Sequence, residues 1–208
     1  MRWVADSAHT LAEIEVGSPG DAWESLGFAV DEGAIALGRT RVRPTGAGGG
    51  MLAWTIAGLH SDRLDGLPTT LTPVAPLVPR ARHPNGAVRI DHVVARTPRF
   101  DATVAALLDA GLELRRVRDA TPEIRQGFLW IGDVILELVE DPSAESPMLW
   151  GLVVVVDDID VLAAQLGDRI GAPKQAIQPG RQIVVVRDEH APGVPLAFMT
   201  PHVKRAAA

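Results

Sequence analysis

The sequence predicts an α+β protein built from repeated units, in each of which one strand, a short helix and three further strands follow one another. Residues 89–140 and residues 149–199 both show this order. Each segment opens with an apolar strand, continues with a short amphipathic helix that ends near a glycine, and returns through strand-like runs. Because the same order occurs twice, the repeat is stronger evidence for the fold than either segment alone.

Composition and cysteine content limit the class of protein. The chain has 208 residues, of which 47% are hydrophobic, enough for one large or two small packed domains. No run reaches the roughly 18 apolar residues of a membrane span, and acidic residues interrupt the N-terminus where a signal peptide would be apolar. We therefore expect a cytoplasmic protein without a membrane partner. The absence of cysteine excludes disulfides, thiolate metal sites and cysteine nucleophiles.

The charge balance argues against a nucleic-acid partner. The net charge of -6 would be repelled by a phosphate backbone. Basic residues cluster only at Arg115, Arg116, Arg118 and Arg125. We interpret this cluster as a solvated strand edge that discourages aggregation. The alternative is the entrance of a pocket that attracts an anionic ligand.

The N-terminal third predicts a shorter unit of the same kind. Residues 10–16 alternate apolar and polar side chains, as in a half-buried strand. Asp21 is predicted to cap a short helix that Gly27 ends, and short strands follow. The glycine-rich residues 46–50 lack the lysine and the following helix of a phosphate loop, so we expect a hairpin connection. Trp54, in the next strand, is expected in the core.

A proline-rich segment divides the chain. Its prolines disfavour a helix or a central strand, and its His-Pro-Asn-Gly end suits a tight turn with His83 at the surface. The predicted organisation is a degenerate N-terminal region, a linker, a two-module domain and a tail, at residues 1–67, 68–86, 87–201 and 202–208.

The two complete modules have recognisable helix boundaries. In the first module, Asp101 is predicted to cap a helix over residues 101–109. In the second module, Asp157 or Asp158 is the expected cap, and Gly167 the residue that ends the helix.

The repeated order of strand, helix and three strands is clearest in the segments HVVARTPRFDATVAALLDAGLEL, GDVILELVE and LWGLVVVVDDIDVLAAQLG. It resembles the vicinal oxygen chelate superfamily, which includes glyoxalases, bleomycin resistance proteins, extradiol dioxygenases and certain epimerases. Residues 10–67 look like an eroded copy of the same domain. The resemblance implies repeated βαβββ modules that form curved mixed sheets around a cleft, with helices on the convex side.

The resemblance also implies where a metal would bind. Metal-binding members carry up to four ligands, on the first and last strand of each module, and a divalent ion held there stabilises an enediolate. The matching positions of the first module are His92 and Glu137. In the second module they are Gly151 and Ala197, which cannot bind a metal. Half of the metal site is missing, so no cofactor is firmly predicted and a divalent metal stays an option.

Three interpretations of the site remain open. The first is metal-free binding of a small molecule, as in the bleomycin resistance branch. Alternation along the strands places Ile90 and Val94 beside His92, and Ile135 and Val139 beside Glu137. The expected ligand-binding residues are Phe128, Trp130, Trp150, Ile90 and Ile135.

The second interpretation is catalysis by His92 and Glu137 as a proton-transfer pair. The enzyme would then be a lyase, isomerase or dioxygenase type acting on a small carbonyl or diol compound. The third is a metal shared across a homodimer, where two copies of each residue restore four ligands. An alternative of another class is a non-catalytic interaction module in which the N-terminal region became a docking surface.

Overall fold

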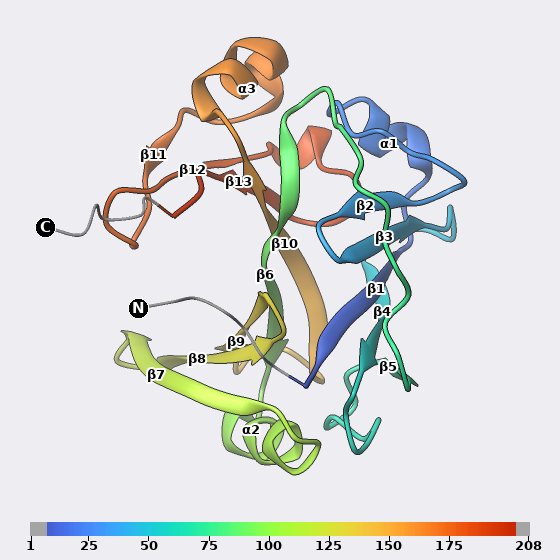
Figure 1. Cartoon of the computed structure of the whole chain (residues 1–208). Coiled ribbons are helices and arrows are strands. Elements are labelled where there is room, and N and C mark those ends of the chain that lie inside the picture. Colours follow the sequence, from blue (N-terminus) through green and yellow to red (C-terminus); the bar gives the residue numbers. More distant parts are fainter. Residues whose placement is uncertain (1–7, 203–208) are drawn as a thin grey trace, which may run out of the picture.

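The computed structural model describes residues 8–202, which form two mixed β-sheets and three short α-helices (Figure 1). The N-terminal sheet has the strand order β2-β3-β1-β4-β5. Its elements are β1 (Thr10–Val16), α1 (Gly20–Glu24), β2 (Ile35–Leu37), β3 (Thr40–Pro44), β4 (Met51–Ala57) and β5 (Thr69–Thr72). Within residues 8–202, no helix has the length and apolar character needed to cross a membrane.

The second sheet has eight strands in the order β11-β12-β13-β10-β6-β9-β8-β7. Its first module contains β6 (Ala87–Thr97), α2 (Phe100–Asp109), β7 (Glu113–Thr121), β8 (Ile124–Ile131) and β9 (Val134–Glu140). Its second module contains β10 (Met148–Val156), α3 (Ile159–Leu166), β11 (Lys174–Gln175), β12 (Gln182–Val185) and β13 (Leu196–Met199), with 3-10 turns at Gly167–Arg169 and Asp188–His190.

The predicted fold class is confirmed by the way these strands pair. In each module the first strand is parallel to the last, and the remaining strands follow antiparallel. The two first strands, β6 and β10, pair antiparallel at the centre of the sheet. The modules curve away from this centre as two arms, with α2 and α3 on the outer sides (Figure 1). That the arms enclose a ligand cleft stays a prediction.

The N-terminal sheet repeats this plan in shortened form. Strands β1 and β4 pair antiparallel at its centre, β3 is parallel to β1, and β5 is parallel to β4. The predicted linker over residues 68–86 therefore begins with an edge strand, where a missing backbone donor is tolerated. The prediction of a hairpin connection at residues 46–50 was wrong. Strands β3 and β4 both pair with β1, so this connection crosses the end of β1.

Both sheets pack into one hydrophobic core. At most 1% of the surface is exposed in each of three large side chains, Trp23, Trp54 and Phe198. The rings of Phe28 and Phe198 stack with centroids 5.8 Å apart, which joins the N-terminal part of the chain to β13. Trp54 lies in the core as expected, and its ring Nε1 donates to Thr69 Oγ1 at 2.7 Å. The domain boundaries given above remain a prediction.

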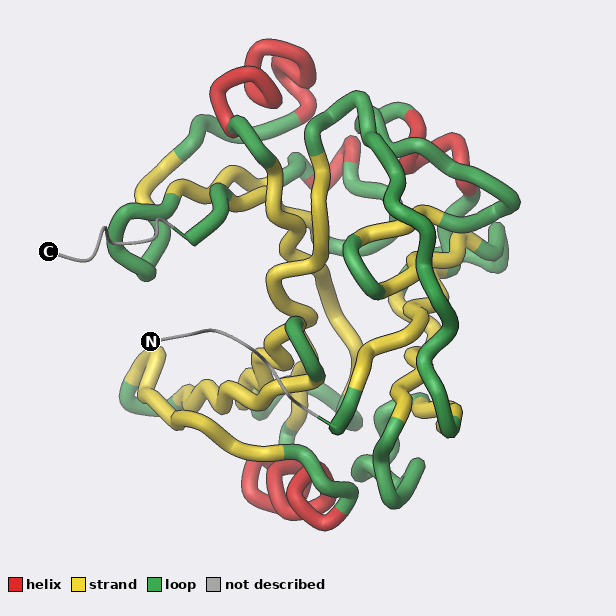
Figure 2. Tube along the Cα trace, in the orientation of Figure 1, coloured by secondary structure: helices red, strands yellow, loops and turns green. Residues whose placement is uncertain are grey.

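His83 is buried, contrary to the surface position expected for it. Its Nδ1 accepts a hydrogen bond from the amide of Ala29 at 3.0 Å, and its Nε2 lies 2.9 Å from the carbonyl oxygen of Ala36. The imidazole thus pins the end of the proline-rich segment to the N-terminal sheet. Figure 2 shows residues 73–86 as a long loop that runs beside this sheet from β5 to β6.

The predicted helix caps are confirmed in part. Asp158 caps α3, because its carboxylate accepts from the amides of Asp160 and Val161, and Gly167 ends the helix with a φ of 56°. Asp21 and Asp101 instead lie inside the first turns of α1 and α2, which have no side-chain cap. A carboxylate in a first turn still interacts favourably with the helix dipole.

Replacement of Phe198 by alanine tests the shared core. Loss of this buried ring should lower the free energy of unfolding by about 3–5 kcal/mol. Urea unfolding followed by circular dichroism should show one transition, shifted as a whole. The control Leu77→Ala, at a side chain 94% exposed, should change stability by less than about 0.5 kcal/mol. Two transitions of which only one shifts would contradict a single core.

Candidate functional site

A β-bulge in β6 determines which side chains reach the site. His92 pairs with Val153 of β10, and Ile90 pairs with Val154, so Asp91 is an extra residue between two regular pairs. The bulge lets neighbouring side chains share a face, and Asp91 Oδ2 lies 3.0 Å from His92 Nδ1. It also turns Ile90 into the main core, where 1% of its surface is exposed. Simple alternation placed Ile90 beside His92, and that expectation was wrong.

The remaining predicted residues gather on one face of the eight-stranded sheet, which we call the inner face. Ile135 pairs with His92 and Trp130, while Glu137 pairs with Val94 and Phe128, so all these side chains lie on one side. All of them except the buried Val94 are half-buried, and those on β8 and β9 alternate with fully buried residues of the core. The inner face comprises His92, Val94, Arg96, Gln126, Phe128, Trp130, Ile135, Glu137, Val139, Trp150, Val153 and Ala197.

His92 and Glu137 meet at the centre of the inner face. His92 Nε2 lies 3.5 Å from Glu137 Oε2, and the two side chains are 12% and 17% exposed. Glu137 Oε1 accepts from Gln126 Nε2 at 2.9 Å, and Gln126 Oε1 accepts from Arg118 Nε at 2.7 Å. Glu137 is therefore held from one side by a polar chain that ends at the edge strand β7.

A buried ion pair holds His92 from the other side. Arg181 Nη2 lies 2.7 Å from Asp91 Oδ1, and Arg181 Nη1 lies 3.3 Å from Asp91 Oδ2. The Arg181 side chain is fully buried and that of Asp91 is 2% exposed. Arg181 Nε donates to the carbonyl oxygen of Thr200 at 2.7 Å, which ties the pair to the end of β13.

Burial raises the pKa of Asp91, but hydrogen bonds from His92 and Arg181 outweigh it and hold this pKa well below its usual range. The carboxylate is thus ionised and accepts a hydrogen bond from the Nδ1–H group of His92. In the neutral imidazole, Nε2 is then an acceptor that faces the Glu137 carboxylate. With this tautomer, His92 Nε2 and Glu137 Oε2 are two acceptors 3.5 Å apart and cannot bond each other. A proton shared between them, or donor groups of a ligand, would satisfy them.

His202 and Arg89 complete the surroundings of the ion pair. Burial lowers the pKa of His202, and the positive charge of Arg181 lowers it further. His202 Nε2 lies 3.3 Å from Arg181 Nη1, and Arg89 Nη2 lies 3.6 Å from Asp91 Oδ1. The Asp91 carboxylate therefore interacts with several cationic or donor groups and remains charged in the interior.

The registers also place the positions that match His92 and Glu137 in the second module. An approximate twofold relates β6 to β10, because His92 pairs with Val153 and Gly151 pairs with Val94. The same symmetry matches Glu137, the partner of Val94, to Ala197, the partner of Val153. Gly151 and Ala197 thus occupy the places of the two absent ligands.

A four-ligand metal site does not fit these residues. A Cβ added at Gly151 would lie 2.9 Å from the carbonyl oxygen of Pro195, so backbone fills the space where a ligand side chain would begin. Among residues 8–202, no group of three or more His, Cys, Asp or Glu side chains could hold a metal ion. One chain supplies two donors, whereas catalytic zinc sites usually use three protein ligands.

Arginines cover the aromatic side chains of the inner face. The guanidinium of Arg96 lies 3.9 Å from the ring centroid of Trp150, which sits at a second bulge, between Leu149 and Gly151. Arg116 and Arg118 lie 4.9 and 5.3 Å from the ring centroid of Phe128. The arginine cluster thus combines an exposed edge strand, as expected, with stacking contacts at the border of the inner face.

Sequence reasoning missed Asp91, Gln126 and Arg181. Asp91 adjoins His92, but neighbours in a regular strand face opposite sides, so only the bulge makes them partners. Gln126 lies two residues before Phe128 on the same strand face, a signal that alternation could have provided. Arg181 lies 90 residues from Asp91, and no local pattern connects the two.

The Asp91→Asn variant tests the buried pair. With the Arg181 charge left unpaired, we expect the free energy of unfolding at pH 7 to fall by about 3–5 kcal/mol. The pKa of Asp91 is lower in the folded protein than in the unfolded chain, where it is near 3.8. The ionised carboxylate therefore stabilises the folded state at pH values above 3.8, and this contribution is lost as the pH falls. The stability difference between wild type and variant should therefore narrow below about pH 4.

The matched control is Asp101→Asn, which removes an exposed carboxylate 2.8 Å from Arg125 and should have a much smaller effect. Urea unfolding from pH 7 to pH 3 measures both variants. A stability difference for Asp91→Asn that stays constant across this range would contradict the buried, ionised carboxylate.

Comparisons with known proteins give a likeness of fold. No protein-family profile and no curated protein matches the chain. A methylmalonyl-CoA epimerase from Mycobacterium tuberculosis is similar with a TM-score of 0.48 and 18% identity, over 57% of this chain and 91% of that one. A hypothetical protein from Bacillus halodurans C-125 has a TM-score of 0.46 and 20% identity, over 57% and 98% of the two chains.

A methylmalonyl-CoA epimerase from Streptomyces coelicolor, in complex with 2-nitronate-propionyl-CoA, has a TM-score of 0.45 and 21% identity, over 56% of this chain and 99% of that one. The likeness concerns the fold alone, and the strand order and registers described above carry the structural conclusions.

Proposed function

We propose that the inner face binds a small organic molecule at His92 and Glu137. The observation that supports this most directly is that His92 Nε2 and Glu137 Oε2, 3.5 Å apart on partly exposed side chains, are held in place from opposite sides. The Arg181–Asp91 pair orients His92, and Gln126 orients Glu137. Such preorganisation lowers the entropic cost of binding a donor group, such as a hydroxyl, between the two acceptors.

The surrounding side chains favour a ligand with an apolar body. Val94, Ile135 and Val139 flank the polar pair on the central strands, and Phe128 and Trp130 lie on the next strand. Most small-molecule sites combine apolar walls with a few polar groups that fix orientation. Arg96 and Arg116 at the aromatic border favour a ligand that also carries a negative charge.

Proton transfer is the second candidate function, in an isomerase-type reaction on a small carbonyl compound. It is favoured by the orientation of His92, whose Nδ1 proton is engaged by Asp91 so that Nε2 is left to accept a proton. Glu137 Oε2 lies next to that nitrogen. One of the two groups would take a proton from the carbon beside the carbonyl, and the resulting enolate would regain a proton at another atom.

Ligand screening tests the binding proposal. Thermal stability should rise with at least one compound in a library of small carbonyl, diol and aromatic compounds, because binding to the folded state stabilises it. Loss of one hydrogen bond to a charged group, by Glu137→Gln, should weaken that ligand roughly tenfold or more. His92→Gln should weaken it as well, as measured by titration calorimetry.

The matched controls are Glu145→Gln and His190→Gln, which change the same residue types at exposed positions. Both controls should leave the affinity unchanged. If every hit keeps its full affinity in the His92 and Glu137 variants, the ligand site lies elsewhere.

A divalent metal is not part of this proposal, because one chain supplies only two of four donors. We expect protein purified without chelator to contain far less than half an equivalent of divalent metal per chain, by elemental analysis. The contrasting result would be one equivalent per two chains together with a dimer by light scattering, which would support the shared site across a homodimer.

A further inference from the structure

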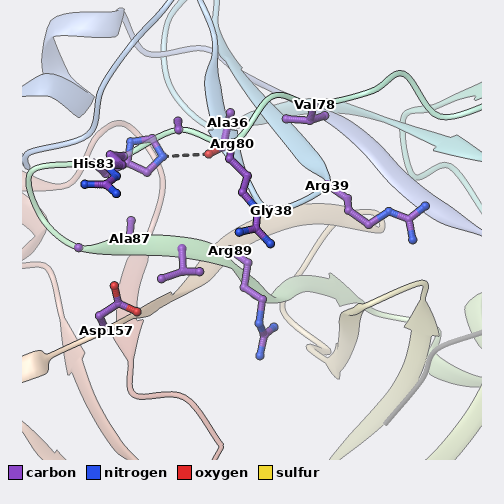
Figure 3. Close-up of a pocket in the computed structure, with 13 residues that line it drawn as sticks. Ala36, Gly38, Arg39, Val78, Arg80, His83, Ala87, Arg89 and Asp157 are labelled. Carbon is purple, nitrogen blue, oxygen red and sulfur yellow. Dashed lines mark hydrogen bonds between the residues drawn. The ribbon is translucent and has the colours of Figure 1, made fainter.

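A second candidate site lies at the start of β6, where a cavity of about 910 Å³ separates the N-terminal sheet from the proline-rich segment (Figure 3). Its walls come from the β2–β3 turn at Gly38 and Arg39, from residues 78–83, and from the first residues of β6. Neither His92 nor Glu137 lines it. Its volume falls in the range that suits a metabolite or a nucleotide.

The lining of this cavity is strongly basic. Arg39, Arg80, Arg82 and Arg89 line it, and Asp157 is the one acidic residue among the lining residues. Four positively charged residues and one negatively charged residue thus line this cavity, in a chain whose net charge is -6. This local excess does not follow from the overall composition, and it creates a positive potential inside a concave surface.

Two of the arginines make hydrogen bonds within the protein: Arg39 Nη2 donates to Thr10 Oγ1 at 3.4 Å, and Arg89 Nη1 donates to the carbonyl oxygen of Ile90 at 3.1 Å. Arg89 lies 3.6 Å from Asp91, but among residues 8–202 Arg39, Arg80 and Arg82 form no ion pair. In Figure 3, Arg80 extends from the proline-rich segment toward Gly38 and the start of Arg89. Its guanidinium can therefore donate into the cavity without first breaking a salt bridge.

The frame of the cavity is fixed at both ends of the proline-rich wall. His83 accepts from the amide of Ala29 through Nδ1 and bonds Ala36 through Nε2, so it is a neutral structural residue and not a ligand group. Toward the other end, Arg41 donates to the carbonyl oxygen of Leu77. A wall held in this way presents its arginines at reproducible positions.

We propose that this cavity binds a phosphorylated small molecule, with Arg39 and Arg80 as its main charged contacts. A guanidinium offers a planar set of donors that matches phosphate oxygens in pairs, and each bond to a charged oxygen is stronger than a neutral one. Contacts from two walls suit a ligand that carries more than one negative charge. The site is separate from the His92–Glu137 pair, and its function does not require the proposed inner-face ligand.

The test uses the full chain and inorganic pyrophosphate as the probe, by titration calorimetry at pH 7 and low salt. We expect saturable binding that weakens as salt is added, because mobile ions screen the contacts. The double variant Arg39→Gln with Arg80→Gln should lose at least about tenfold in affinity. Its unchanged melting temperature would show that the loss is not caused by unfolding.

The matched control is Arg63→Gln, at an exposed arginine outside the cavity lining, and it should bind pyrophosphate as the wild type does. No saturable binding at millimolar pyrophosphate would overturn the proposal, and so would equal weakening in the control. Citrate separates phosphate recognition from general attraction of anions. Citrate that binds as tightly as pyrophosphate would contradict a phosphate-specific site.

Discussion

The antiparallel pairing of β6 with β10 is the constraint on which the rest of the structure depends. One face of this pair carries Ile90 and Val154 into the core that both sheets share. The other face carries His92 and Val153 toward the partly exposed inner face. Because a strand alternates between its two faces, a shift of one residue would exchange core and site, and the bulge at Asp91 makes that shift locally.

The bulge explains why a charged pair can exist at the centre of the sheet. It brings Asp91 to the side of His92, where the fully buried guanidinium of Arg181 neutralises the carboxylate. A buried ion pair is weak evidence for stability, since desolvation offsets much of the attraction. A buried carboxylate that orients an accessible imidazole is better explained by the position it gives to His92 Nε2, next to Glu137.

Much of the fold could be predicted from the sequence, because the repeat is written in local patterns. The strand and helix order of both modules was predicted from apolar periodicity, except for the two-residue strand β11. Asp158 and Gly167 bound α3 as expected. The match of Gly151 to His92 also agrees with the strand registers. Features that depend on distant residues were not predictable, such as the contact of Arg181 with Asp91 and the hydrogen bonds of His83 with the backbones of Ala29 and Ala36.

Arginine has different roles in different parts of this acidic chain. Arg181 is an internal counter-ion, Arg96 and Arg116 cover aromatic rings, and Arg39 and Arg80 face a cavity. Counting charges along the sequence detects only the cluster on β7 and β8, because the other arginines come together through the fold. Local electrostatics in this protein therefore depend on topology more than on composition.

The proposed site depends most on the contact by which Asp91 orients His92, so that His92 Nε2 faces Glu137. Nitrogen NMR of the histidine rings, with His92→Gln to assign the signal, tests this directly. We predict that His92 carries a proton on Nδ1 and that Asp91→Asn changes this signal. A neutral His92 ring with its proton on Nε2 would contradict this orientation.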